Sequence, residues 1–306
     1  MDKTAYIFPG QGSQYVGMGK DLCAAFSAAR DLFDRADGIL GVKLSSICFE
    51  GPEDVLKQTA NTQPAIFVHS LAAARLKQGE PAAMTAGHSL GEYSALVHAG
   101  ALTFEDGLRL VRLRGELMQR AGEERPGTMA AVVGLDPEAV EQCCRRASAE
   151  GIVQCANFNS PGQIVISGSV AGVRAAMAFA KETGAKLVKE LVVSGAFHSP
   201  LMESARNGLR EALGKTALHD AKIPVYANVT AGGVQKAEEI RTLLDRQLIS
   251  PVRWEESVRA MISAGTGKFV ELGPGKVLQG LVKRIDASVH VSGIDKTSDV
   301  QTVVTA

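Results

Sequence analysis

The stretch at residues 81–99, PAAMTAGHSLGEYSALVHA, constrains the fold of this chain more than any other. A short apolar run leads into Gly87-His88-Ser89-Leu90-Gly91, and a run of small residues with a helical pattern follows. Gly-x-Ser-x-Gly between a strand and a helix is typical of a nucleophile elbow, where a serine in a strained turn exposes its hydroxyl. We expect glycine at both flanks because strand and helix pack too closely there for side chains. The alternative is an ordinary Gly/Ser turn.

A second glycine-bearing turn follows the first predicted strand at residues 5–9. Its sequence is Gly10-Gln11-Gly12. A dinucleotide-binding loop needs a further glycine at the position of Tyr15, together with an acidic residue after a second strand, and the chain has neither. We therefore favour a loop that exposes its backbone at the carboxyl end of a strand, where open α/β sheets bind ligands. A plain turn is the alternative.

Strands and helices are expected to alternate through most of the chain, which predicts an α/β fold with a mostly parallel sheet. Outside residues 122–194, the expected helices are 20–37, 53–59, 63–78, 103–121, 201–213, 237–249, 252–265 and 277–285. The strands expected with them are 5–9, 81–86, 224–231 and 268–272.

The composition changes at residues 122–127, GEERPG, and a self-contained run follows. Its predicted order of strand, helix, strand, strand, helix, strand is the ferredoxin-like βαββαβ motif. We predict a larger α/β subdomain from residues 1–125 and 195–306, with a ferredoxin-like subdomain inserted at 126–194. Asn157, Asn159 and Gln163 can line the cleft between the two, although Asn-Ser-Pro-Gly also favours a simple turn.

Arg114 interrupts the apolar face of the predicted helix at residues 103–121. Leu110 and Met118 flank it on that face, whereas Thr103 and Asp106 form a plausible capping box at the helix start. A buried guanidinium needs an anionic partner. One interpretation is a structural ion pair with a buried carboxylate. The other is a seat for the carboxylate of a substrate, which arginine grips through two hydrogen bonds.

A serine nucleophile needs a base, and the chain has six histidines. His69 and His98 fall within predicted helices among apolar or small residues, where packed histidines are usual, and His88 should point away from Ser89. His198 stands in the loop that re-enters the large subdomain and can reach the carboxyl edge of its sheet. No acidic third member is evident, because Asp106 and Asp136 cap helices, so the imidazole is expected to be oriented by a neutral acceptor.

Composition excludes several other function classes. Lys and Arg balance Asp and Glu at 33 each, so net charge gives no case for binding nucleic acid or an anionic membrane. The five cysteines show no C-x-x-C spacing, which favours reduced thiols in the cytoplasm over disulfides or zinc. We expect no signal peptide and no membrane span, since no apolar run approaches about 18 residues.

Six motifs together resemble those of bacterial malonyl-CoA:acyl-carrier-protein transacylases. They are FPGQGSQ (8–14), GHSLGEYSAL (87–96), Arg114, NSPGQIVISG (159–168), AFHSPLM (196–202) and ELGPGKVL (271–278). The resemblance covers residues 4–295. It implies that residues 1–125 and 195–306 form an α/β-hydrolase-like catalytic subdomain that carries the ferredoxin-like insert at 126–194. It also implies a ping-pong transfer of malonyl from coenzyme A to the phosphopantetheine thiol of acyl carrier protein.

The resemblance also implies roles for individual residues. Ser89 would be the nucleophile and His198 the base, with the backbone N–H groups of Gln11 and Leu90 as the oxyanion hole. Arg114 would bind the malonyl carboxylate. The further substrate-site residues that it implies are Gln63, Met118, Phe197, Asn159 and Gln247, the last through a main-chain carbonyl that orients the histidine.

The expected enzyme is therefore an acyl-carrier-protein S-malonyltransferase of fatty acid synthesis, without a metal or other cofactor and acting as a monomer. One alternative is a discrete malonyltransferase that serves polyketide synthases, with unchanged chemistry. Another is a serine esterase or thioesterase, which needs the same serine, histidine and oxyanion hole but no buried arginine.

Overall fold

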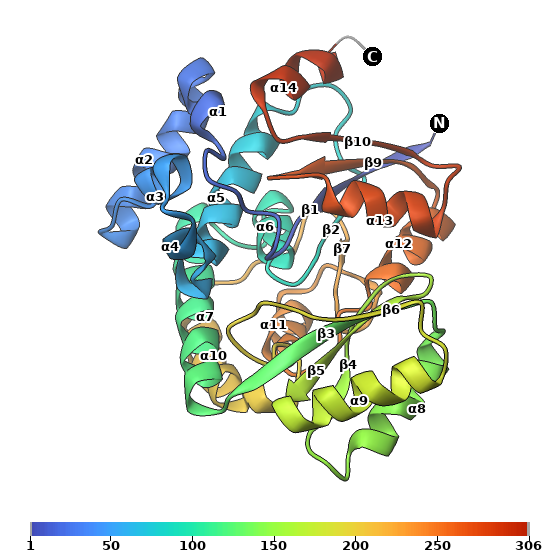
Figure 1. Ribbon diagram of the computed structural model, residues 1–306. Coiled ribbons are helices and arrows are strands. Elements are labelled where there is room, and N and C mark those ends of the chain that lie inside the picture. Colours follow the sequence, from blue (N-terminus) through green and yellow to red (C-terminus); the bar gives the residue numbers. More distant parts are fainter. Residues whose placement is uncertain (1, 305–306) are drawn as a thin grey trace.

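The computed structural model describes residues 2–304 and shows two subdomains, each built around a sheet (Figure 1). The larger sheet has the order β10-β9-β1-β2-β7-β8. Its first five strands are parallel, and only β8 runs antiparallel to its neighbour. The strands are β1 (Lys3–Phe8), β2 (Met84–Gly87), β7 (Val225–Tyr226), β8 (Gly233–Val234), β9 (Thr266–Leu272) and β10 (His290–Ile294).

Both faces of this sheet are covered, as is usual for parallel sheets. Neighbouring residues of β1 show the alternation, because Phe8 packs into one apolar cluster with Phe67 and Ile7 into the other with Trp254 and Phe269. The helices of this subdomain are α1 (Lys20–Ala25), α2 (Ser27–Leu40), α3 (Leu44–Glu50), α4 (Glu53–Lys57), α5 (Thr59–Leu76), α6 (Gly91–His98), α7 (Phe104–Glu124), the short 3₁₀ helix η1 (Pro200–Met202), α10 (Glu203–Lys215), α11 (Ala237–Gln247), α12 (Trp254–Ser263), α13 (Val277–Ile285) and α14 (Thr297–Val304).

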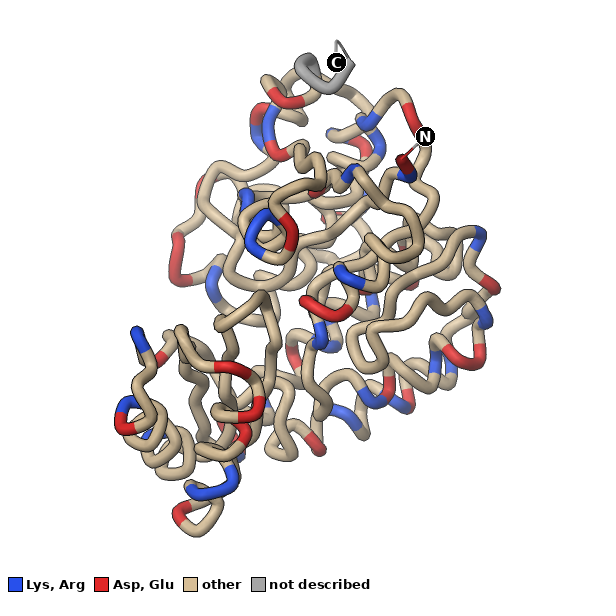
Figure 2. The backbone as a smooth tube through the Cα atoms, turned by 90° about the vertical axis from the view of Figure 1, so that its right-hand side faces the viewer, with Lys and Arg blue, Asp and Glu red and all other residues tan. Residues whose placement is uncertain are grey.

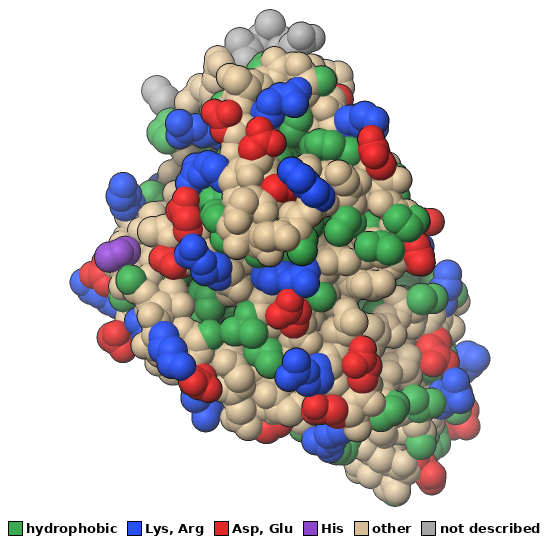
Figure 3. Space-filling model, turned by 90° about the vertical axis from the view of Figure 1, so that its left-hand side faces the viewer, with side chains coloured by type: hydrophobic (Ala, Val, Ile, Leu, Met, Phe, Trp, Pro, Cys, Tyr) green, Lys and Arg blue, Asp and Glu red, His purple; other side chains and the backbone are tan. Residues whose placement is uncertain are grey.

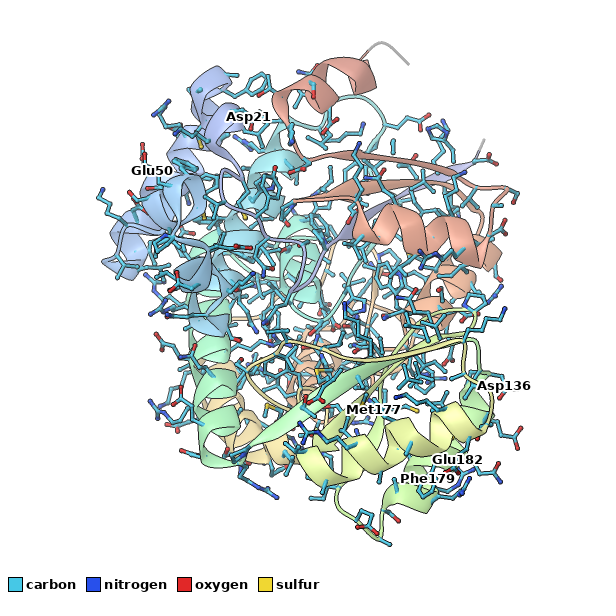
Figure 4. All side chains as sticks on the ribbon, in the orientation of Figure 1. Asp21, Glu50, Asp136, Met177, Phe179 and Glu182 are labelled. Atoms are coloured by element: carbon cyan, nitrogen blue, oxygen red, sulfur yellow. The ribbon has the colours of Figure 1, made fainter. Side chains whose placement is uncertain are left out.

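The smaller sheet is antiparallel, in the order β4-β5-β3-β6. Its elements are β3 (Gly127–Val133), α8 (Pro137–Ala147), β4 (Val153–Ser160), β5 (Gln163–Ser169), α9 (Val170–Glu182) and β6 (Leu187–Glu190). The helices α8 and α9 contact each other through Arg146, whose guanidinium lies 4.0 Å from the ring centre of Phe179 and 3.5 Å from Glu182, both labelled on α9 in Figure 4. The predicted α/β fold with a ferredoxin-like βαββαβ unit is confirmed.

Two contacts fasten the smaller sheet to the larger subdomain. The chain crosses itself where it enters and leaves the insert: a Cβ on Gly122 would lie 2.0 Å from the carbonyl oxygen of Ser194, so only glycine fits. The edge strand β4 also bonds to the loop before α12. Val252 donates to the carbonyl of Ala156 (2.8 Å) and accepts from the N–H of Phe158 (2.9 Å).

Several predicted boundaries differ from the observed ones. The helix expected at 20–37 is two helices, because Phe26 adopts an extended conformation between them. Helix α7 continues to Glu124, into the expected linker. The last strand predicted for the insert is paired only over Leu187–Glu190, since the chain then leaves the sheet to cross α7. The strand expected at 224–231 shrinks to Val225–Tyr226, before a tight turn with Ala231 at φ 56°.

The sequence patterns missed α3, β8, β10 and α14. The subdomain boundaries at residues 125/126 and 194/195 stay a prediction, and residues 1 and 305–306 lie outside the described part of the chain. Within that part, no helix is both long enough and apolar enough to span a bilayer. Basic and acidic residues are interspersed along the backbone (Figure 2), and their side chains are mixed over the face shown in the space-filling view (Figure 3).

Candidate active site

Ser89 sits in a sharp turn between β2 and α6, with φ at 52° in the left-handed region that few non-glycine residues adopt. The two flanking glycines allow this turn. A Cβ on Gly87 would lie 1.9 Å from the carbonyl carbon of Gly91, and one on Gly91 would lie 2.1 Å from the oxygen of Phe8. The expected reason for both glycines is confirmed: strand and helix approach too closely for side chains.

Two buried polar residues hold this elbow from behind. Asn228, on the loop after β7, accepts from the N–H of Ser89 (2.7 Å) and donates to the carbonyl of Gly87 (2.7 Å). Its own backbone N–H donates to Oε2 of Glu92 (2.9 Å), in the first turn of α6. Hydrogen bonds on both sides of the strained residue therefore fix its conformation.

His198 faces the serine hydroxyl, with Nε2 2.8 Å from Oγ of Ser89. Its other nitrogen, Nδ1, lies 3.0 Å from the carbonyl oxygen of Gln247 and 3.1 Å from that of Ser250. Carbonyl oxygens only accept, so Nδ1 carries the ring proton and Nε2 keeps a lone pair for the serine proton. The imidazole is thus oriented by neutral carbonyl oxygens rather than by an acid, as expected. Gln247 supplies one of the two oxygens.

The surroundings of His198 keep the imidazole uncharged. Burial, together with the positive charge of Arg114, lowers the pKa of His198 to about 3. A neutral imidazole can act as a base at any pH well above that value. The loop that carries it is tied to the insert, because Nε2 of Gln154 in β4 donates to the carbonyl of His198 (2.8 Å).

Arg114 reaches the same point from α7 and is fully buried. Its Nη1 donates to Oε1 of Gln63 (2.9 Å), and its Nη2 donates to Oε1 of Gln247 (2.9 Å) and to Oγ of Ser89 (3.0 Å). Amide and hydroxyl oxygens thus hold the guanidinium, and among the described residues no carboxylate forms an ion pair with it. The interpretation of Arg114 as half of a structural ion pair is therefore wrong.

Two of the residues implied by the resemblance adjoin this guanidinium. The side chain of Gln63 lies between Arg114 and Met118, since its Nε2 also donates to the Met118 sulfur (3.1 Å). Gln63 and Met118 are both buried. Phe197 precedes the histidine and is buried in the core of the large subdomain.

The loop that carries Gln11 lies directly against the elbow. A Cβ on Gly10 would be 2.4 Å from the carbonyl oxygen of His88, so the two backbones touch. The side chain of Gln11 donates to Thr59 (3.3 Å). Within residues 2–304 the backbone N–H groups of Gln11 and Leu90 bond to no acceptor, which leaves both donors available for a ligand.

Asn159 contacts His88, the residue that precedes Ser89. Its Oδ1 is 2.9 Å from Nε2 of His88, whose ring packs against Trp254 with the centres 5.7 Å apart. The amide of Asn159 thus holds the neighbour of Ser89. Gln163 is not brought to this site, because its side chain accepts from Arg284.

The family model of the acyl transferase domain matches residues 5–303 of this chain. The chain belongs to the acyl transferase family.

Several proteins are similar to this chain over nearly their whole length. The malonyl CoA-acyl carrier protein transacylase of Bacillus subtilis is 48% identical over 99% of this chain and 96% of that protein. The crystal structure of an acyl carrier protein S-malonyltransferase from Vibrio cholerae superposes with a TM-score of 0.95 at 42% identity, covering 98% of this chain and 99% of the other. A malonyl-transacylase solved in complex with a type II polyketide synthase acyl-carrier protein has a TM-score of 0.96 at 42% identity, covering 99% of each chain.

Sequence reasoning missed four residues that the structure brings to this site: Glu92, Gln154, Asn228 and Ser250. The sequence could have indicated Glu92, because it is an acidic residue among small and apolar ones in the helix directly after the elbow. Asn228 and Ser250 lie in loops far along the chain, and no spacing rule links them to Ser89.

Proposed function

We propose that this acyltransferase is an acyl-carrier-protein S-malonyltransferase that moves malonyl from malonyl-CoA to the phosphopantetheine thiol of acyl carrier protein, supplying fatty acid synthesis. One observation carries the proposal. A fully buried arginine, which pairs with no carboxylate in the described part of the chain, lies 3.0 Å from the hydroxyl of a Ser–His pair. Such a cation is suited to an acyl group that ends in a free carboxylate. The names of the relatives support the same activity.

In the first half-reaction, Nε2 of His198 takes the proton of Ser89 as Oγ attacks the thioester carbonyl of malonyl-CoA. The carbonyl oxygen becomes an oxyanion that the N–H groups of Gln11 and Leu90 stabilise, and the loss of one such donor costs about 3 kcal/mol. When the tetrahedral intermediate collapses, the carbon–sulfur bond breaks. The imidazolium of His198 then gives its proton to the coenzyme A thiolate, and malonyl remains on Ser89 as an ester.

In the second half-reaction, His198 takes the proton of the carrier's thiol, whose sulfur attacks the malonyl ester. The carbon–oxygen bond breaks, and the proton returns to Ser89. Arg114 binds the malonyl carboxylate throughout and exchanges its hydrogen bond to the free hydroxyl for bonds to the substrate. The buried surroundings of His198 and Arg114 limit water at the ester, as a transferase requires.

Intact-mass spectrometry tests the proposal directly. Incubation with malonyl-CoA and no acceptor should give a stable adduct of about 86 Da, the increment of a malonyl ester, which disappears on addition of acyl carrier protein. The variant Ser89→Ala, with the same fold, should give no adduct. Steady release of malonate without an adduct would instead establish a thioesterase.

A polyketide synthase carrier is the second candidate acceptor, favoured by the similarity to the transacylase solved with such a carrier. Transfer rates to a fatty acid carrier and to a type II polyketide carrier, measured side by side, decide between them. We further propose a cytoplasmic monomer that uses no metal or other cofactor. The free state of all five cysteines supports a reducing compartment.

A further inference from the structure

Among the residues that the structure describes, Glu92 is the one carboxylate in the hydrogen-bond network around Ser89, and the mechanism above gives it no part. It stands in the first turn of α6, and 3% of its surface is exposed. A buried carboxylate is costly unless its oxygens accept hydrogen bonds. Two donors meet on Oε2 of Glu92: the backbone N–H of Asn228 (2.9 Å) and Nε2 of Gln247 (3.0 Å).

These two donors lead to different parts of the site. Asn228 connects Glu92 to Ser89, because its side-chain oxygen accepts a hydrogen bond from the N–H of Ser89 (2.7 Å). Gln247 connects Glu92 to Arg114, because its Oε1 accepts a hydrogen bond from Nη2 of Arg114 (2.9 Å). Nε2 of Gln247 also donates to the carbonyl of Ser89 (3.1 Å). One carboxylate oxygen is therefore linked, through one intervening residue in each case, to both Ser89 and the Arg114 guanidinium.

The chemistry of the three groups fixes the direction of the Gln247 amide. A guanidinium can only donate, so it needs the oxygen end of the amide, while the acceptor oxygen of Glu92 needs the NH₂ end. Only one orientation of the amide satisfies both neighbours. Without an acceptor at position 92, the NH₂ end keeps only the Ser89 carbonyl, and the amide that anchors Arg114 loses one of the contacts that hold it.

We propose that Glu92 is a positioning residue for malonyl selectivity: its acceptor oxygen orients the Gln247 amide, and that amide places the Arg114 guanidinium where the acyl carboxylate binds. This inference rests on the proposed function. It concerns the acceptor oxygen rather than the charge. Burial raises the pKa of Glu92 to about 7, so that both protonation states occur near neutral pH, and each state keeps an acceptor oxygen.

The test compares Glu92→Met with Glu92→Gln. Methionine fills a similar volume and accepts no useful hydrogen bond, whereas glutamine keeps an oxygen in place. The readout is the ratio of malonyl to acetyl transfer per active site, which a change in the folded fraction cannot alter. We expect Glu92→Met to lower the ratio by about tenfold or more, as loss of a buried acceptor would. Glu92→Gln should stay within about threefold of the unmodified protein, a difference below one ordinary hydrogen bond.

Glu271 supplies a matched control. It is fully buried, accepts from the backbone N–H groups of Leu278 and Gln279 (3.1 Å each), and its pKa is likewise raised to about 7 by burial. None of its hydrogen bonds reaches Ser89, His198 or Arg114. Glu271→Met should therefore lower stability and leave the ratio unchanged. In an Arg114→Ala background, Glu92→Met should no longer change the ratio, because the guanidinium that Glu92 positions through Gln247 is absent.

If Glu92→Met does not fold, Glu92→Asp gives the same test, because its shorter side chain withdraws the acceptor from Gln247. An unchanged ratio in a folded Glu92→Met or Glu92→Asp variant would overturn the inference. An equal fall of the ratio in Glu92→Gln would do so too, by assigning the effect to charge. An unmodified protein that transfers no malonyl would overturn the proposed function instead.

Discussion

Two regions of the large subdomain hold arginines against the same helix, α11, in opposite ways. On its more exposed side, Asp245 pairs with Arg206 (2.9 Å) and Arg210 (2.8 Å). Two residues along, the side chain of Gln247 faces the interior and offers only an amide oxygen to Arg114. Asp245 is about one-fifth exposed, while Gln247 and Arg114 are buried.

The difference shows that the partners of a guanidinium decide whether its charge is already neutralised within the protein. The guanidinium groups of Arg206 and Arg210 are neutralised in place by a carboxylate that also links α10 to α11. Although burial alone would raise the pKa of Asp245, hydrogen bonds from Arg210 and Arg206 hold it below its ordinary value. Arg114 has amide and hydroxyl partners, and within residues 2–304 no carboxylate forms an ion pair with it, so its charge remains available to a ligand.

The largest effect is expected in the buried region around Arg114. Arg114→Ala removes the two hydrogen bonds that a malonyl carboxylate would receive, each worth about 1.5–3 kcal/mol when charged. We expect kcat/KM for malonyl-CoA to fall by about 100-fold or more, which corresponds to about 2.7 kcal/mol. Acetyl transfer should be unchanged or faster, because acetyl has no carboxylate. Stopped-flow acylation with both thioesters measures this, and an equal fall with both would contradict the role of Arg114.

A smaller effect is expected in the pH dependence of His198, whose pKa reports the unneutralised charge of Arg114. The lowered pKa of His198 stems first from burial and then from the charge of Arg114, so the imidazole stays neutral as the pH falls from 8 to about 5. Acylation of Ser89 should therefore show no loss near the ordinary histidine pKa of about 6.5. In Arg114→Ala the pKa of His198 should rise, since one cause of its lowering is gone. NMR titration of the assigned ring measures the shift, and an identical pKa in both proteins would refute the coupling.

The smallest effect is expected in the more exposed region around Asp245. Arg206→Ala removes a partly exposed ion pair while Arg210 continues to neutralise Asp245. Such pairs contribute about 0–1 kcal/mol to the free energy of unfolding. We expect a loss within that range in denaturant unfolding, with malonyl transfer and the malonyl-to-acetyl ratio unchanged within about twofold, a difference below 1 kcal/mol. A large change in the ratio would mean that the two regions are coupled through α11.

The sequence predicted the parts of this site that depend on local rules. A strained turn flanked by two glycines identifies Ser89, and the helical period exposes Arg114 as a charge on an apolar face. The order of strands and helices likewise predicted both sheets. The resemblance supplied Gln11, Leu90, Gln63 and Met118, which no local pattern could place.

The rest depends on tertiary contacts. Asn228 and Ser250 reach the site because β7 lies beside β2 and the loop after α11 passes under His198. Whether Arg114 is paired or free can be decided only when every nearby carboxylate has been located. The short strands β7 and β8 have two residues each, too few for a periodic pattern to show.

The hydrogen bonds between β4 and the segment around Val252 have a practical meaning for anyone who recombines such enzymes. Gln154 of the insert donates to the backbone carbonyl of His198, and β4 shares backbone hydrogen bonds with Val252, two residues after the Ser250 carbonyl that contacts the imidazole. A foreign insert spliced at residues 126–194 would bring its own edge strand to that seam. Chimeras should therefore exchange the insert together with residues 247–252, so that both sides of the seam come from one parent.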